Sequence, residues 1–424
     1  MTDELTTELA RISSLSVVSR TSVQQYRDTR KALPAVGREL GVDAIVEGSV
    51  AKGSDRLRIT VQLVDARSDR HVWAETLERS LGDAASIQHQ LAQEIANQIG
   101  VQLTPLEQQY FARHHPIDAG SFQAYLQGRY YANKRTPNAL AQAETYFQDA
   151  AARDPNNPLA EAGLADTYLL RGIYTRMSWD EAIRKARATA EKAIALDDQL
   201  AEAHCSAAYI GLLHDWDFSG AEKEFRRALQ LNPNSSTAHQ WYAELLSFRT
   251  SHHEALNEIR RAEELDPFSM IIHHEAGQVL QNAGQYRLAL EEYGKAEALE
   301  PDFFPNHYAA SLAHRRLGEY DQAIRELRRR RVERRLAGPQ RGRYPRARLR
   351  DIRLAWLPPA VRGFPPLLPP TRTIPWRSTS PIWAKQTMPS DRWNKPSATG
   401  RSTSWPCNAP RSLPVSGPIH VTGT

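Results

Sequence analysis

The sequence predicts a small α/β domain, followed by an all-α stack of helical hairpins and a disordered C-terminal tail. Three observations lead to this prediction. Between residues 44 and 77, apolar and polar residues alternate, as they do in β-strands with one buried face. From residue 221 onward, a pattern of alanines, a large apolar residue and a proline returns every 34 residues. Beyond residue 330 neither period continues, and residues 339–424 contain 16 of the 26 prolines.

The N-terminal region alternates between helical and strand patterns. Leu5, Leu9 and Ile12 predict an amphipathic first helix, and a short apolar run at Val17 and Val18 suits a buried strand. The remaining predicted elements follow in chain order: a helix over 35–40, strands over 44–50, 57–63 and 71–77, and a helix over 87–99.

The amino-acid sequence of this region resembles that of the TolB-like (FlgO-like) amino-terminal domain, which precedes tetratricopeptide repeats in bacterial regulators. The resemblance covers roughly residues 1–105 and is carried by residues 1–9 (MTDELTTEL), 19–22 (SRTS), 39–50 (ELGVDAIVEGSV) and 73–75 (WAE). In that family an additional apolar strand precedes the first helix. We therefore expect a truncated sheet with an unpaired edge, and a start codon internal to a longer gene.

The repeated pattern places small residues on one face of a helix. It occurs as Ala221, Phe225, Ala228, Pro233, then as Ala255, Ile259, Ala262, Pro267, and then as Ala289, Tyr293, Ala296, Pro301. Offsets of four and three put three side chains on one helical face, and the proline ends the helix because it lacks the amide hydrogen. Small residues at two positions allow a neighbouring helix to approach closely.

Each unit also contains a first helix that ends in a glycine turn. Gly284 and Tyr286, like Gly318 and Tyr320, precede the anchor alanines in the arrangement Gly-x-Tyr-x-x-Ala. Helix, turn and helix with a 34-residue period resemble the tetratricopeptide repeat. A unit of this size cannot bury its own apolar face, so the hairpins must stack. We predict five to six hairpins over residues 116–330 and a separate tail over 331–424.

The resemblance implies a concave surface lined by the first helices, which would hold an extended peptide or a partner helix. Carried over position by position, it gives these candidate groove residues: Gln240, Glu244, His274, Gln278, Gln281, Asn282, Tyr308, Arg315 and Arg316. Ordinary exposed surface is the alternative interpretation of the same residues.

Proteins with this organisation couple the two regions to an output domain. The resemblance extends to CadC-type transcriptional regulators, serine/threonine kinases with tetratricopeptide repeats, and nucleotide cyclases. It implies that this chain is the sensory or scaffolding part of a bacterial signalling protein, with a protein or peptide partner and no small-molecule substrate.

Enzyme motifs are absent from the sequence. It contains no phosphate-binding loop, dinucleotide fingerprint, zinc-protease helix, nucleophile elbow or kinase signature set. His239, His273 and His307 recur at 34 residues, but stacked hairpins would separate equivalent positions by roughly 10 Å, too far to share a metal ion. We therefore expect no catalytic activity, cofactor or metal, and interpret these histidines as packing residues.

The basic character of the chain comes from its tail. From Arg328 onward there are 20 Lys and Arg residues but three acids, so the tail carries +17 and the remainder −12. One interpretation is a disordered basic arm, which would make the chain a nucleic-acid-binding regulator. The other interpretation is translation in a shifted reading frame. Some of the codons that can encode Trp393 to Pro396 would, when read one base earlier, encode Leu-Glu-Gln-Ala. That sequence is typical of the second helix of a repeat.

No apolar run is long enough to predict a membrane span, and residues 1–4 (MTDE) do not begin a secretion signal. Two cysteines, Cys205 and Cys407, cannot form a disulfide framework. We expect a cytoplasmic chain, or alternatively the periplasmic portion of a membrane-anchored parent.

Overall fold

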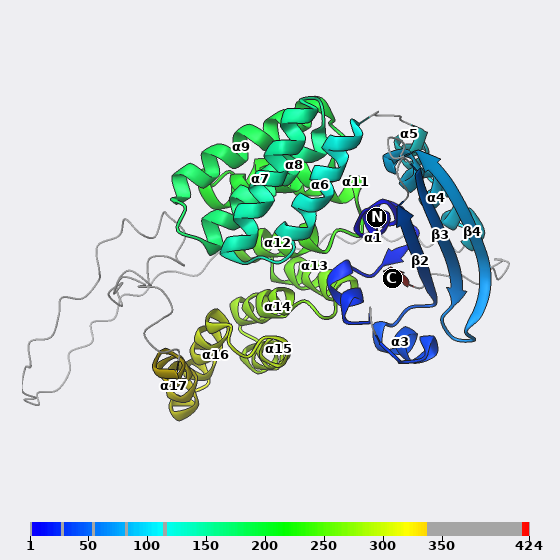
Figure 1. Cartoon of the computed structure of the whole chain (residues 1–424). Helices are drawn as coiled ribbons and strands as arrows, with labels where there is room; N and C mark the ends of the chain where they lie inside the picture. Colours follow the sequence, from blue (N-terminus) through cyan, green and yellow to red (C-terminus); the bar gives the residue numbers. More distant parts are fainter. Residues whose placement is uncertain are drawn as a thin grey trace, which may run out of the picture. The chain divides into compact units, whose positions relative to one another are not determined.

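The computed structural model describes residues 2–26, 29–52, 56–80, 84–112, 117–336 and 418–423, and all of them belong to one compact unit. An N-terminal α/β region is followed by paired helices (Figure 1). The N-terminal helices are α1 (Thr2–Ala10), α2 (Arg20–Val23), the 3-10 helix η1 (Gln24–Tyr26), α3 (Leu33–Leu40), α4 (Ala84–Ile99) and α5 (Pro105–Ala112).

The sheet has five strands in the order β1-β5-β2-β3-β4. They are β1 (Ser16–Val17), β2 (Ala44–Lys52), β3 (Arg56–Asp65), β4 (Arg70–Ser80) and β5 (Pro418–Gly423). β2, β3 and β4 form the predicted antiparallel meander, with a register shift between Leu63 and Val64. The predicted strand positions are therefore confirmed, each strand being slightly longer than expected.

Strand β5 corrects one expectation from the sequence. It pairs in parallel with both β1 and β2, with Ala44 opposite Ile419. The edge of β2 that was expected to be unpaired is thus covered, because the end of the tail supplies the missing hydrogen-bonding groups. Of the tail expected over 331–424, residues 331–336 continue α17 and residues 418–423 form β5, and residues 337–417 lie outside the described part of the chain.

Alternating side chains give the sheet two apolar faces. Leu9 of α1 and Leu91 of α4 pack with Leu63 on one face. Val36 of α3 packs with Ile45 on the other. Successive strand residues point to opposite sides, so α1 and α4 cover one face of the sheet and α3 covers the other.

Six helical hairpins follow within the described residues. They are α6 (Ala119–Ala132) with α7 (Pro137–Arg153), α8 (Pro158–Tyr174) with α9 (Trp179–Leu196), α10 (Ala201–Ile210) extended by the π-helix η3 (Gly211–Asp215) with α11 (Phe218–Leu231), α12 (Ser236–Phe248) with α13 (His252–Leu265), α14 (Met270–Asn282) with α15 (Tyr286–Leu299), and α16 (Phe304–Arg316) with α17 (Tyr320–Leu336). They form the predicted tetratricopeptide-type superhelix.

Small residues let the hairpins approach closely, as predicted. The ring of Phe147 is fully buried between Gly128 and Gly163, where an added Cβ would lie 2.6 and 2.5 Å from ring carbons. At Gly277 the same atom would lie 2.2 Å from the ring of Tyr293. Real Cβ atoms do not come that close, so these positions require glycine.

The turns inside the hairpins recur with the same period. Gly284 and Gly318 have φ of 76° and 78°, which confirms the predicted glycine turns. Trp216 and Thr250 occupy the equivalent positions of earlier hairpins with φ of 59° and 60°. The left-handed turn is therefore a property of the repeat, even where the residue is not glycine.

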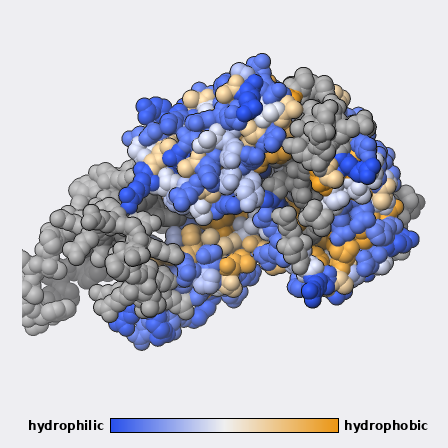
Figure 2. Space-filling model, in the orientation of Figure 1, coloured by the Kyte–Doolittle hydropathy of each residue, from blue (hydrophilic) through white to orange (hydrophobic). Residues whose placement is uncertain are grey.

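Among the described helices, none combines the length and apolar content needed to cross a bilayer. The surface of the hairpins α6–α9 is mostly hydrophilic on the face shown, and hydrophobic patches gather near α13 and α14 (Figure 2).

Candidate functional site

The predicted groove residues lie on the first helices α12, α14 and α16, but they differ in exposure. Asn282, Tyr308, Arg315 and Arg316 are exposed, and Glu244, Gln278 and Gln281 are partly buried. The Asn282 amide donates a hydrogen bond to Ser247 Oγ at 2.9 Å, which links α14 to α12. Seven of the nine candidates therefore reach the surface at least in part.

The other two candidates, Gln240 and His274, are buried. Asn306 Oδ1 lies 3.2 Å from His274 Nδ1, and the Phe303 ring meets the imidazole edge-on at a centroid distance of 5.3 Å. Burial lowers the pKa of His274 to about 4. Tyr308 has the same place in its helix but remains 41% exposed. The difference arises because the turn before α16 covers His274, whereas the described chain contains no hairpin beyond α17.

A pair of carboxylates lies beside aromatic rings on neighbouring first helices. Burial raises the pKa of Glu244 to about 7, and burial together with the Glu244 charge raises the pKa of Glu275 well above its usual range. The Tyr209 hydroxyl donates to Glu244 Oε2 at 3.1 Å, and its ring stacks on Trp241 at 4.0 Å. Among the described residues neither glutamate forms an ion pair.

Only Glu244 of this pair was a candidate from the sequence. Glu275 corresponds to Trp241 one repeat earlier and to Ala309 one repeat later, so no periodic signal marks it.

A cavity of about 840 Å³ opens between the N-terminal region and the first helices. Thr6 and Arg20 line it from one side, and Arg129, Asp166 and Gln240 line it from the other. Burial raises the pKa of Asp166, partly offset by arginines at positions 135 and 129. The lining of the cavity therefore includes both acidic and basic side chains, among apolar residues such as Phe147 and Trp241.

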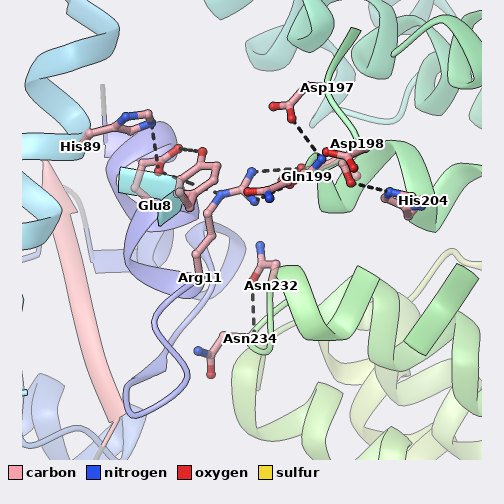
Figure 3. A network of polar contacts seen from close by, with 11 residues as sticks. Glu8, Arg11, His89, Asp197, Asp198, Gln199, His204, Asn232 and Asn234 are labelled. Carbon is pink, nitrogen blue, oxygen red and sulfur yellow. Dashed lines mark hydrogen bonds and ion pairs between the residues drawn. The ribbon is translucent and has the colours of Figure 1, made fainter. Parts of the chain in front are cut away.

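Helix α1 is held against the turns that join successive hairpins (Figure 3). Arg11 Nη1 donates to the Gln199 carbonyl at 3.4 Å, and Nη2 lies 3.4 Å from Glu202 Oε2. One repeat further on, the Asn234 amide donates to the Ala10 carbonyl at 3.0 Å. These contacts were not predictable, because nothing in the periodicity relates α1 to the turns.

The next turn along continues this contact. The Ser22 hydroxyl donates to Asp266 Oδ1 at 2.7 Å and accepts from the Phe268 amide at 2.9 Å. Ser19 N donates to the Leu265 carbonyl at 2.6 Å. Three successive turns thus bind the N-terminal region, the first two at residues 10–11 and the third at residues 19–22.

The recurring histidines each join three segments, an arrangement that we call the histidine clamp. In every case Nδ1 meets a glutamate of the second helix and Nε2 meets the carbonyl of the preceding turn. The four clamps are His204 with Glu224 and Asp198, His239 with Glu258 and Pro233, His273 with Glu292 and Pro267, and His307 with Glu326 and Pro301. The four imidazoles lie in four separate hairpins, as expected.

A second glutamate joins two of the clamps, which the sequence analysis did not foresee. Glu263 Oε1 lies 3.3 Å from His273 Nδ1. Burial alone would lower the pKa of His273, but the nearby carboxylates of Glu263 and Glu292 outweigh it and raise that pKa to about 9. The additional glutamates of the two clamps, Glu263 and Glu297, are 34 residues apart, and this spacing could have revealed them.

Cys205 behaves as a buried apolar residue. It is 5% exposed, and burial raises the pKa of its thiol well above the usual range. A thiol that resists deprotonation is a poor nucleophile.

No family model matches the chain. It is 27% identical over 212 residues to putative adenylate cyclase 3 of Rhizobium meliloti (strain 1021), a match that covers 49% of this chain and 36% of that relative. The chain therefore spans about a third of the relative's length.

The solved structures that resemble it are tetratricopeptide-repeat proteins and pilus factors. YrrB, a TPR protein with an unusual peptide-binding site, is 19% identical with a TM-score of 0.31, covering 43% of this chain and 88% of YrrB. The type IV pilus biogenesis factor PilW is 16% identical with a TM-score of 0.41, covering 51% of this chain and 95% of PilW.

Proposed function

We propose that this chain is the regulatory, protein-binding part of a bacterial signalling protein. Residues 116–330 would hold a peptide or partner helix in the groove, and residues 1–105 would form a TolB-like domain beside it. In this proposal the chain catalyses nothing itself, and the output activity resides elsewhere in the parent protein.

The polar row on successive first helices supports the proposal best. Gln278, Gln281 and Asn282 of α14 and Arg315 and Arg316 of α16 reach the surface from neighbouring helices. Amide and guanidinium groups at helical spacing can hydrogen-bond the backbone of an extended peptide. A groove built from first helices is also the recognition surface that stacked repeats provide.

The cyclase-named relative agrees with a signalling context. Its match to roughly half of this chain is what a shared regulatory region of a larger protein would give. CadC-type regulation and a serine/threonine kinase output are the other contexts implied by the sequence resemblance.

Selection from a random peptide display library against the full chain tests the proposal. The affinity of a selected peptide, measured by fluorescence anisotropy, should fall about tenfold in Asn282→Ala and again in Arg315→Ala, since each loses about one hydrogen bond. Arg260→Ala, on the exposed side of the second helix α13, is the matched control and should bind as the parent does.

Two outcomes would contradict the proposal: no peptide is selected, or the groove variants bind as tightly as the control. Binding to duplex DNA with an affinity that falls steeply with salt would instead favour the nucleic-acid alternative.

A further inference from the structure

Three ligand atoms converge where the fourth hairpin meets the fifth. Glu263 of α13, His273 of α14 and Glu292 of α15 each direct one atom to a common point, and these atoms all lie within 4.8 Å of one another. His273 Nδ1 is 2.9 Å from Glu292 Oε2 and 3.3 Å from Glu263 Oε1. We call this set the first triad.

These separations are close to those around a single ion. Metal bonds of about 2.0–2.2 Å in tetrahedral geometry place neighbouring ligand atoms roughly 3.3–3.6 Å apart. The contact of His273 with Glu263 already has this length, and the hydrogen bond between His273 and Glu292 would lengthen by about 0.5 Å on binding. His273 Nε2 lies 3.0 Å from the Pro267 carbonyl. A ring N–H bound to a backbone carbonyl is the usual partner of a metal-ligating histidine, because it directs the lone pair of the other nitrogen to the ion.

One oxygen of the first triad is incompletely satisfied. Glu263 Oε1 is buried, and among the described residues it has the ion-pair contact with His273 Nδ1 at 3.3 Å but no well-formed hydrogen bond. Lys295 Nζ binds Glu292 through the other oxygen, Oε1, at 2.7 Å, so Oε2 remains directed at the triad. A buried carboxylate oxygen without a well-formed hydrogen bond is costly, and a bound cation would complete its surroundings.

The same set recurs 34 residues later as Glu297, His307 and Glu326, which we call the second triad. Its Nδ1 lies 2.8 Å from Glu326 Oε2, and its Nε2 lies 2.7 Å from the Pro301 carbonyl. The recurrence shows that the arrangement belongs to the hairpins and is not an accident of one helix end.

The two earlier histidine clamps lack the additional glutamate. Leu229 precedes His239, and Ile194 precedes His204, at the spacing at which a glutamate precedes the histidine in each triad. His239 and His204 nevertheless form the same contacts with one glutamate and one carbonyl. A second carboxylate is therefore not required to hold the hairpins together, and its presence in two hairpins needs another reason.

We propose that each triad binds one divalent metal ion through its histidine Nδ1 and one oxygen of each glutamate. One nitrogen and two oxygen donors suit Zn²⁺, Co²⁺ or Mn²⁺, with water completing the coordination. The ion replaces the proton on Nδ1, which passes to solvent, so binding strengthens as the pH rises. Each ion would tie the second helix of one hairpin to both helices of the next.

Calorimetric titration of the full chain, without a purification tag, with ZnCl₂ tests this. We expect two ions per chain, one in Glu263→Gln or Glu297→Gln, and none at these sites in the double variant. Glu264→Gln is the matched control, because Glu264 is the exposed neighbour of Glu263 and pairs with Arg261 instead. In parallel, Co²⁺ should give visible ligand-field bands in the parent chain and lose them in the double variant.

Thermal unfolding provides a second readout that does not depend on the variants folding equally well. Added Zn²⁺ should raise the Tm of the parent chain and of Glu264→Gln, but not that of the double variant. Failure of Zn²⁺, Co²⁺ and Mn²⁺ to bind, or a stoichiometry unchanged in the double variant, would overturn the proposal. Neither result bears on peptide binding, which does not involve the triads.

Discussion

Replacing Glu244 by glutamine should stabilise the protein, and the gain should depend on pH. Burial raises the pKa of this carboxyl from 4.5 to about 7 in the folded chain. The folded state therefore holds the proton more tightly than the unfolded state does. Ionisation of Glu244 lowers the free energy of unfolding. This loss is absent below pH 4.5, grows between pH 4.5 and 7, and reaches its full size above pH 7.

The magnitude follows from the shift. A raised pKa of this size corresponds to at most about 3 kcal/mol, since one pKa unit is about 1.4 kcal/mol, and interaction with Glu275 spreads the effect over both carboxyls. Glutamine keeps an oxygen that can accept the Tyr209 hydroxyl but carries no charge. We expect Glu244→Gln to gain about 1–3 kcal/mol at pH 8 and little at pH 4.5.

Urea unfolding monitored by circular dichroism at the two pH values measures this gain. Glu191→Gln, an exposed position on α9, controls for the loss of one negative charge. An equal gain at both pH values, or a loss at pH 8, would refute the argument that desolvation of this carboxylate opposes folding.

Three further predictions concern the close packing of the hairpins, their glycine turns and the contact that holds helix α1. Gly277→Ala should lower the free energy of unfolding in urea by about 1–3 kcal/mol, because its Cβ would lie 2.2 Å from the Tyr293 ring. Gly294→Ala, in the open part of α15, is the control and should raise it by about 1 kcal/mol. Equal effects of the two substitutions would contradict the close approach at Gly277. Gly284→Ala should cost about 1–2 kcal/mol because φ is 76° there, and the same unfolding curve would show it. Asn234→Ala removes the hydrogen bond to the Ala10 carbonyl, so hydrogen exchange should quicken in α1 but not in α15; unchanged exchange would mean that this contact does not hold the helix.

Local patterns predicted most of the fold. The strand over 57–63 was recognisable because Ile59 and Val61 face the core while Arg58 and Thr60 face outward. The hairpins were recognisable because their anchors recur at a fixed spacing. Both signals arise from burial on one face of an element, which a sequence displays directly.

Contacts between distant segments were not predictable. The pairing of β5 with β2 joins residues that are far apart in the sequence, and no period marks 418–423 as a strand. Trp216 adopts the turn conformation of Gly284 although its side chain gives no indication of it. The burial of His274 depends on the hairpin that follows, which periodicity alone places only approximately.

The histidine clamps determine how the repeats come apart. Each imidazole contacts the turn that leads into its own hairpin and the second helix of that hairpin, as His239 does with Pro233 and Glu258. The two helices of a hairpin therefore cannot separate without releasing the turn that joins them to the previous hairpin, so the clamps couple the opening of one hairpin to the loosening of its junction with the previous one. We infer that the array unfolds in one concerted transition, and that fraying under tension would begin at a terminal hairpin.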